Sequence, residues 1–193
     1  MKKQNKKLDI LEIGARLIHQ NGFNHTGLQE ILQEANVPKG SFYFYFKNKE
    51  DFGLQVIDYI ALNIESTLNS FLMDEKYKHI DRLRKFLNDF LNIYIESDFQ
   101  GGCPMGNLAL EMADTNEMFR NKLNDNFTLL TKAIENTLRQ AQEKGEISED
   151  KNIKELAKFI TFSWEGVIMQ MKINREREAL DIFNHFVFEK LLK

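Results

Sequence analysis

The sequence contains few residues that break regular structure or crosslink the chain. Its 193 residues include 1 cysteine, 2 prolines and 10 glycines. One cysteine cannot form a disulfide within the chain, and so few breakers disfavour a β-sandwich or barrel, which needs frequent turns. With 42% hydrophobic and 28% charged residues, the composition is globular and excludes intrinsic disorder and a collagen-like chain. We therefore expect an all-α fold with few sharp turns.

Long apolar runs are absent too. The longest spans only a few residues, whereas a membrane-spanning helix needs about 20. The lysine-rich start, Met1 to Lys7, is not followed by the continuous apolar stretch of a signal peptide. These absences predict a cytoplasmic protein with no membrane partner.

The charged residues are distributed unevenly along the chain. Up to Lys49 there are 8 basic and 4 acidic residues, a net charge of +4. The remaining 18 basic and 25 acidic residues give a net charge of −7, for a total of −3. A basic head on an acidic body favours a polyanionic partner for the head alone, although a solvated lysine-rich tail would give the same count.

Helical periodicity near the N-terminus predicts three helices. Apolar residues at helical spacing indicate a first helix over about residues 6–21. Thr26 and Gln29 have the spacing of a capping box, which predicts a second helix over about residues 26–35. The proline that follows suits a helix start, so a third helix is expected over about residues 38–46. Two short helices joined by a tight turn on the basic part of the chain are what a helix-turn-helix requires.

The predicted third helix is unusually aromatic, with five aromatic residues among the seven from Gly40 to Phe46. Phe42 and Phe46 lie four residues apart and suit the core. Tyr43 and Tyr45 lie on other faces, where their hydroxyl groups are expected to reach outward. Side chains that bind phosphate oxygens or base edges are found in the same region, namely Lys39, Ser41, Tyr43 and Lys49.

The rest of the chain also shows helical spacing, and no strand pattern competes with it. Further helices are expected over about residues 52–71, over 83–94 with a stop at Gly101 and Gly102, from Pro104, and over 119–141 with a cap at Gly145.

Two segments near the C-terminus, residues 159–171 and 180–191, are apolar around most of the helix circumference. A helix that is apolar all round is buried on all sides. One chain of this size is not expected to cover both helices on all sides. We therefore expect them to meet a second copy of the chain across a two-fold interface, which buries the second face. Ordinary burial against the body is the alternative.

A set of short motifs runs through residues 8–52. They are alanine-x-valine, lysine-glycine, phenylalanine-tyrosine-x-x-phenylalanine and lysine-glutamate, and the matching positions are Ile10-Leu11, Ala15, Gly22-Phe23, Thr26, Ile31, Ala35, Val37, Lys39-Gly40, Phe42-Tyr43, Phe46 and Lys49-Glu50. As a set, these residues resemble the N-terminal domain of the TetR family of bacterial transcriptional repressors. The resemblance implies a three-helix DNA-binding domain at residues 1–50, an all-helical ligand-binding and dimerisation domain at 51–193, and a homodimer joined through the last two helices.

The resemblance also implies DNA contacts, residue by residue. Phosphate contacts fall on Thr26, Lys39, Tyr43, Tyr45 and Lys49, and base-edge contacts fall on Gln29, Pro38, Gly40 and Ser41. The chain departs from the family pattern at Gly27, Asn36, Pro38 and Tyr45. Asparagine tolerates left-handed backbone, so the turn at Asn36 is expected to survive. A dimer would set two recognition helices about 34 Å apart, or somewhat further, and read a palindrome with salt-dependent affinity.

The segment from Phe99 to Leu108 is the most unusual part of the body. Cys103 directly precedes the proline that starts a predicted helix, where unpaired amides and the helix dipole favour a thiolate. The acidic neighbours Glu96 and Asp98 oppose this, and a buried apolar cysteine is the alternative. The run glycine-cysteine-proline-methionine-glycine-asparagine resembles one subset of the TetR family, several of whose members respond to electrophiles or reactive oxygen and chlorine species through a cysteine.

Reversible binding of a small molecule is the competing interpretation of the sensor. Methionine and aromatic residues at helical spacing favour an apolar pocket, although they more often form ordinary core. The candidate lining residues are Tyr94, Phe99, Met105, Leu108, Phe127, Trp164 and Met169.

These patterns predict a dimeric DNA-binding transcriptional regulator that a small molecule or electrophile releases from its operator. No enzyme, metal or cofactor is predicted, because the histidines His19, His25, His79 and His185 are isolated and the cysteine has no neighbouring histidine. A helical protein-interaction module, or an anti-repressor that kept the fold without specific operator binding, is the alternative function.

Overall fold

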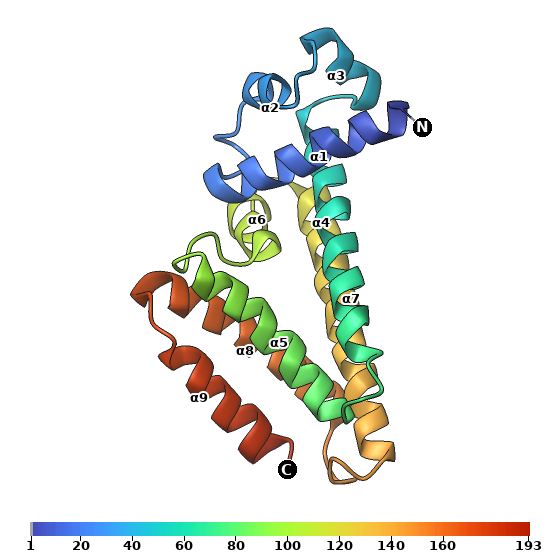
Figure 1. Cartoon of the computed structure of the whole chain (residues 1–193), viewed down its shortest axis with the longest axis vertical. Coiled ribbons are helices and arrows are strands. Elements are labelled where there is room, and N and C mark those ends of the chain that lie inside the picture. The colour runs from blue at the N-terminus through green and yellow to red at the C-terminus, as the bar shows by residue number, and fades with distance from the viewer. Residues whose placement is uncertain (1) are drawn as a thin grey trace. The chain divides into compact units, whose positions relative to one another are not determined.

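The computed structural model describes the backbone of residues 2–193 and the side chains from Lys6 onward. These residues form nine α-helices and a closing π-helical turn, and no strand occurs among them (Figure 1). In chain order the elements are α1 (Lys2–Asn21), α2 (Leu28–Glu34), α3 (Lys39–Tyr45), α4 (Lys49–Leu72), α5 (His79–Glu96), α6 (Pro104–Met112), α7 (Glu117–Glu143), α8 (Ile153–Asn174), α9 (Glu178–Phe186) and η1 (Val187–Leu191). The predicted all-α fold is confirmed. Within the described residues, no helix is long and apolar enough to cross a membrane.

The helices pack into two compact units. The first runs up to Ile64 and includes Pro104–Asp125, and the second comprises Glu65–Cys103 and Asn126–Lys193. The first unit therefore holds α1, α2, α3 and α6, and α4 and α7 each contribute to both units. These units are groupings by packing, and the functional boundary after residue 50 stays a prediction.

Aromatic rings hold the short helix α3 in place within the first unit. Phe42 and Phe46, the two rings predicted for the core, are 0% and 1% exposed. Their ring centroids lie 5.7 Å and 5.0 Å from that of Phe52 on α4. Helix α1 approaches the same ring at Gly14, where a Cβ atom would lie only 2.2 Å from Phe52 Cζ. Helices α1, α3 and the start of α4 thus share one aromatic core.

The turn between α2 and α3 has the left-handed residue that the sequence predicts. Asn36 has a φ of 51°, a conformation that its short polar side chain tolerates. The Asn36 N–H donates to Gln33 O at 3.1 Å, and the Val37 N–H donates to Leu32 O at 2.9 Å. Asparagine therefore replaces the glycine that is common at this turn, and the hydrogen bonds that close the end of α2 are still made.

The predicted capping box at the start of α2 is wrong. Helix α2 begins at Leu28, and its N-cap residue Gly27 provides no side-chain cap. Thr26 is 0% exposed. Its hydroxyl donates to the Gly22 carbonyl at 2.7 Å and to the Leu17 carbonyl at 3.3 Å. Thr26 therefore closes the turn between α1 and α2 instead of capping α2.

In the second unit, α5, α8 and α9 lie side by side (Figure 1). Trp164 of α8 packs its ring 4.9 Å from the centroid of Phe90 of α5. Arg84 of α5 donates to Glu189 of the π-helical turn at 2.7 Å, and the same guanidinium lies 4.7 Å from the centroid of the Phe188 ring. Apolar packing and one charged contact therefore fix the C-terminal segment on α5.

Within the single chain, α8 and α9 each bury only one face, and the predicted burial of the other face against a second copy stays a prediction. One face of each is buried, as Trp164 and Phe183 illustrate, with exposed fractions of 3% and 4%. The other face is apolar and open, with exposed fractions between 50% and 70% at Phe159, Phe162, Met169, Ile173, Ile182 and Phe186. The second unit thus leaves an apolar face uncovered.

Helix α5 ends before the glycine pair that was predicted to stop it. Its last residue is Glu96, and Ser97 is the C-cap. Asp98 and Phe99 both have a φ of 56°, so the chain leaves the helix through two consecutive left-handed residues. The segment that leads to Cys103 is therefore a defined loop and not the end of the helix.

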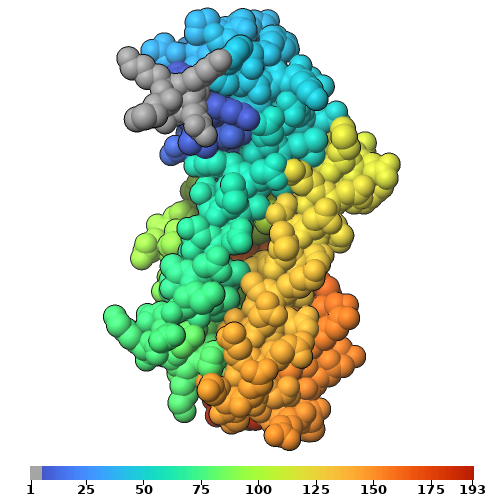
Figure 2. All heavy atoms as spheres, turned by 90° about the vertical axis from the view of Figure 1, so that its right-hand side faces the viewer, coloured from blue at the N-terminus to red at the C-terminus, as the bar shows by residue number. Residues whose placement is uncertain are grey.

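The start of α5 is capped from a loop distant in sequence. Within the second unit, the C-terminal parts of α4 and α7 lie beside each other (Figure 2), and α7 leads through Gly145 to Glu146. The Glu146 carboxylate accepts hydrogen bonds from the backbone N–H groups of His79 at 3.2 Å and Ile80 at 3.1 Å, and from His79 Nδ1 at 2.8 Å. It thereby satisfies two of the amides that the first turn of a helix leaves unpaired.

Removing this cap should destabilise the fold in a pH-dependent way. Burial raises the pKa of Glu146, but its hydrogen bonds with His79 and Ile80 outweigh burial and hold that pKa below its ordinary value of 4.5. Because the folded-state pKa is depressed, the stabilisation is fully present above pH 4.5 and disappears as the pH falls through the lowered folded value. We expect Glu146→Ala to lower the free energy of unfolding by about 1–3 kcal/mol at neutral pH and by less in acid.

Urea unfolding of the wild type and the variant at about pH 7 and about pH 3 measures both effects. The exposed residue Glu149 provides the control, since Glu149→Ala should change little at either pH. An equal loss from Glu146→Ala at both pH values would contradict the role given to its carboxylate.

Candidate DNA-binding surface and sensor segment

Helices α2 and α3 form a helix-turn-helix whose second helix has two distinct faces. Phe42 is buried, while Tyr43 and Phe44 are 59% and 60% exposed. Because the aromatic core fixes Phe42 and Phe46 inward, Tyr43 and Phe44 on the other side of the helix face solvent. The exposure of the Phe44 ring was not predicted from the sequence. The available signal was that Phe44 directly follows Tyr43, which was predicted to point outward.

The structure exposes most of the residues predicted to contact DNA, but not all of them. Gln29, Pro38, Lys39, Gly40 and Tyr43 are exposed, and Ser41, Tyr45 and Lys49 are half-buried.

Thr26 differs from the others because it is fully buried. Its hydroxyl is already bonded to carbonyl oxygens inside the turn. A side chain with no exposed surface cannot reach a phosphate without rearrangement, so the Thr26 hydroxyl supports the turn and is not available to DNA in this structure.

Lys49 lies at the start of α4 against the turn between α1 and α2. Its Nζ donates to the Asn24 carbonyl at 3.3 Å and lies 4.7 Å from the centroid of the Phe23 ring. Burial lowers the pKa of Lys49, and the negative charge of Glu111 opposes that shift. The ammonium is therefore held in a defined place before any phosphate arrives.

Cys103 is buried, with 6% of its surface exposed. This burial agrees with the alternative in which Cys103 is an apolar core residue. It directly precedes Pro104, the first residue of α6. The structure adds a neighbour that the sequence did not reveal, because the Cys103 thiol donates a hydrogen bond to the Glu165 side chain of α8. Burial raises the pKa of Glu165, and the hydrogen bond from Cys103 partly offsets that rise.

Two cations from the end of α8 contact the loop before Cys103. Lys172 Nζ donates to the Gly101 carbonyl at 3.0 Å, and Arg175 Nη1 donates to the Asp98 carboxylate at 3.3 Å. The sequence near Cys103 offers no basic residue, but tertiary packing supplies positive charge from about 70 residues away along the chain.

The residues predicted to line an apolar pocket have different environments. Tyr94 and Trp164 are buried in the second unit, where the Tyr94 and Phe99 ring centroids are 6.1 Å apart. Among the described residues, no hydrogen-bond partner is within reach of the Tyr94 hydroxyl, Trp164 Nε1 or Glu165 Oε1.

The four other members of that predicted lining set are placed differently. Met105 and Leu108 are each 3% exposed and belong to the first unit. The structure differs from the prediction at Met169, which is 55% exposed. Met169 lies two helical turns from Phe162 and belongs to the open apolar face of α8. Phe127 is half-buried on α7.

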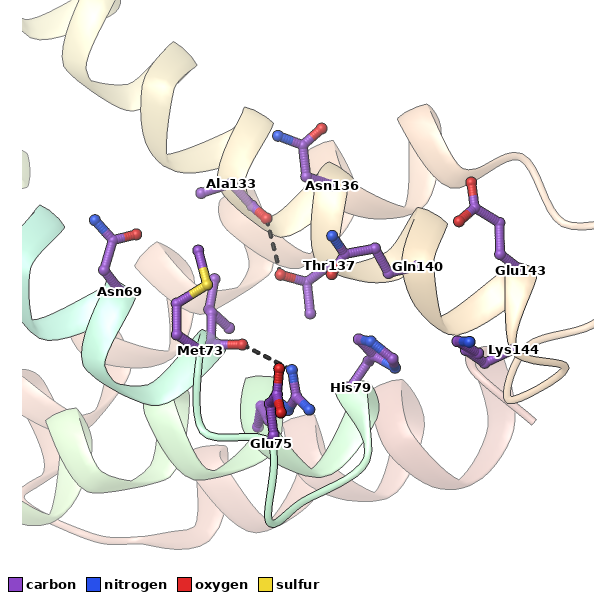
Figure 3. A pocket seen from close by; sticks show the side chains of 12 residues that line it. Asn69, Met73, Glu75, His79, Ala133, Asn136, Thr137, Gln140, Glu143 and Lys144 are labelled. Atoms are coloured by element: carbon purple, nitrogen blue, oxygen red, sulfur yellow. Dashed lines mark hydrogen bonds between the residues drawn. The ribbon is translucent and has the colours of Figure 1, made fainter.

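A separate cleft opens in the second unit between α4, α5 and α7 (Figure 3). Its volume is about 650 Å³. Thr137 and Gln140 of α7 lie across from His79 of α5 and from Met73, which directly follows α4, and the Thr137 hydroxyl donates to the Ala133 carbonyl at 3.0 Å. None of the predicted sensor residues lines it. Among the residues whose side chains are described, no group of three or more histidine, cysteine or acidic residues could hold a metal ion.

An all-α chain with an N-terminal helix-turn-helix and a separate helical body defines a class of DNA-binding regulators. The family model described as bacterial regulatory proteins of the tetR family matches residues 10–56. The model described as a tetracyclin repressor-like C-terminal domain matches residues 80–187. The chain belongs to the TetR family of transcriptional regulators.

Individual relatives agree with this assignment over nearly the whole chain. The HTH-type transcriptional repressor DhaR of Mycobacterium sp. strain GP1 is 36% identical, over 95% of this chain and 90% of its own length. A solved structure titled regulatory protein TetR from Rhodobacter sphaeroides has a TM-score of 0.87 and 31% identity, with 94% of this chain and 96% of that chain covered. The structure of the reduced form of E. coli NemR has a TM-score of 0.87 and 26% identity, with 96% of each chain covered.

Substitutions on the two faces of α3 should change the stability of the fold by very different amounts. Phe42→Ala should lower the free energy of unfolding by about 3–5 kcal/mol, because it empties a fully buried ring site. Tyr43→Ala should change stability by no more than about 0.5 kcal/mol, because the ring faces solvent. Urea unfolding followed by circular dichroism separates the two, and comparable losses would contradict the orientation of α3.

Proposed function

We propose that this chain is a homodimeric transcriptional repressor. It binds a palindromic operator through α2 and α3, and an electrophile that reacts with Cys103 releases it. The observation that carries the proposal is the exposed polar face of a recognition helix held by a buried aromatic core, in a chain whose relatives include named repressors.

The DNA contacts divide into two groups. Lys39, Tyr43, Tyr45 and Lys49 would bind phosphate oxygens, which supply affinity and make it fall with salt. Gln29, Pro38, Gly40 and Ser41 would approach base edges in the major groove, which supplies specificity. Support comes from their position in the family motif and from the surface that each of these eight residues retains.

The open apolar face of α8 and α9 is the proposed dimer interface. On α8, Phe159, Phe162, Met169 and Ile173 follow one another at spacings of three, seven and four residues, which places them on one helix face, and each is at least half exposed. Apart from neighbouring residues of its own helix, nothing lies within 4 Å of where a Cβ atom of residue 166 would be, so a second backbone could approach closely at Gly166. Such a surface suits a second copy of itself, because a two-fold interface pairs each residue with the same patch.

The sensor chemistry would use Cys103 and Glu165 together. A carboxylate with a raised pKa is a better base than an ordinary one, and this one accepts the thiol hydrogen bond. With a maleimide, the sulfur would bond to one carbon of the double bond. The thiol proton would pass to Glu165 and then to the other carbon, so that the thiol adds with no leaving group.

Release would follow from crowding at the start of α6. Cys103 is only 6% exposed, and extra atoms in a well-packed site force the surroundings to move. Because α6 begins at the next residue, an adduct would favour an arrangement with lower operator affinity. The solved relative described as the reduced form of NemR is named for its redox state, which accords with a thiol sensor.

Binding to the DNA that flanks the gene tests the function and the sensor in one experiment. Mobility shifts over a salt series should show affinity that falls steeply with salt. N-ethylmaleimide should weaken binding by the wild type at least about tenfold and leave Cys103→Ser unaffected. Because Cys103 is the one cysteine of the chain, a single added mass that appears on the wild type and is absent from Cys103→Ser shows that the reagent reacted at Cys103.

The outcomes separate the alternatives. Unchanged DNA binding by fully alkylated protein would refute the thiol sensor and leave a non-covalent ligand as the inducer. No specific binding by the untreated wild type would refute the repressor and favour an interaction module or anti-repressor.

Charge placed on the open apolar face should break the dimer. We expect Phe162→Glu to halve the molar mass measured by light scattering and to weaken operator binding, since two charges would otherwise be buried together. Leu129→Glu is the matched control, because Leu129 is 62% exposed on α7, away from α8 and α9 in sequence. A dimer that persists in Phe162→Glu would show that the interface lies elsewhere.

A further inference from the structure

Within the first unit, α6 is joined to the turn between α1 and α2 by a single carboxylate. Glu111 Oε2 accepts the Phe23 N–H and Glu111 Oε1 accepts the Asn24 N–H, both at 2.7 Å. The two partners lie 87 and 88 residues before Glu111 in the sequence. Hydrogen bonds to an ionised acceptor are among the stronger ones in proteins.

The turn is shaped to receive this carboxylate. Gly22 has a φ of 85°, a left-handed conformation that favours glycine. A Cβ atom at Gly22 would lie 3.1 Å from Glu111 Oε2 and 3.3 Å from Oε1, closer than most side chains allow. The carboxylate therefore occupies space that any residue other than glycine would fill.

The same turn holds Lys49 on its other contacts. The Asn24 carbonyl accepts the Lys49 ammonium at 3.3 Å, and the Phe23 ring lies 4.7 Å below it. The Phe23 ring also packs 4.9 Å from the centroid of Phe119 on α7. Residues 23 and 24 are thus bound to Glu111 through their amides and to Lys49 through a carbonyl and a ring.

We propose that Glu111 is a positioning residue for operator binding. It holds the turn between α1 and α2, and through that turn it holds Lys49 where a phosphate can be bound. This inference rests on the operator binding proposed above and does not depend on the Cys103 sensor. Glu111 would therefore strengthen operator binding although its side chain is negatively charged. An acidic side chain without such contacts, elsewhere on a DNA-binding unit, weakens binding to the polyanion.

The sign of the effect provides the test. Glu111→Ala should weaken operator binding about tenfold, and Glu111→Gln should weaken it less because one amide oxygen still accepts. Glu12, exposed on α1 in the same unit, provides the matched loss of one negative charge. Glu12→Gln should leave the affinity unchanged or raise it slightly.

Two further readouts distinguish positioning from general destabilisation. If Lys49 loses its phosphate contact, the plot of log affinity against log salt should become less steep in Glu111→Ala, by about 1 unit of slope. A smaller folded fraction would leave the slope unchanged. Glu111→Ala should also cost much less in a Lys49→Ala background, because the two residues then share one effect. Thermal unfolding of each variant verifies that it is folded at the temperature of the assay.

Wild-type binding with unchanged or tighter binding by Glu111→Ala would overturn this inference alone. Fully additive effects of Glu111→Ala and Lys49→Ala would also overturn it. If the wild type binds no specific DNA, the repressor proposal fails and this inference fails with it, so the two failures are distinguishable.

Discussion

The recognition helix depends on the packing of Phe42 and Phe46 against Phe52. Helix α3 is only seven residues long, and a helix of that length is not stable in water without tertiary contacts. The buried rings therefore determine whether α3 exists as well as which way it faces. The direction of the exposed side chains of α3 is set by those rings, and Gly14 contributes by letting α1 approach Phe52 closely.

The turn between α1 and α2 links the recognition surface to α6 within the same unit. Thr26 closes that turn from inside, Glu111 binds its amides and Lys49 binds its carbonyl. One short segment of backbone thus connects a helix of the body to a predicted phosphate contact. Because α6 starts directly after Cys103 in the chain, a change at the cysteine has a covalent route to the helix that carries Glu111.

The second unit combines a packed interior with an uncovered apolar face. Trp164 and the rings of α5 satisfy the inner side of α8, whereas Phe162 and its neighbours remain open. Exposed apolar patches of this kind mark interaction sites in soluble proteins. The same helix also carries Glu165 beside the buried Cys103 thiol, so α8 takes part in both the proposed dimer and the proposed sensor.

Local patterns in the sequence were enough to predict the all-α fold, the helix-turn-helix, the inward rings of α3 and the left-handed turn at Asn36, because each depends on residues within a few positions of one another. The capping box failed because the Thr26 hydroxyl bonds to the carbonyl oxygens of Leu17 and Gly22, which its spacing to Gln29 does not reveal. Glu111, Glu165 and Lys172 have partners about 60 to 90 residues away along the chain. Such contacts arise from how helices pack, and no local period or motif encodes them.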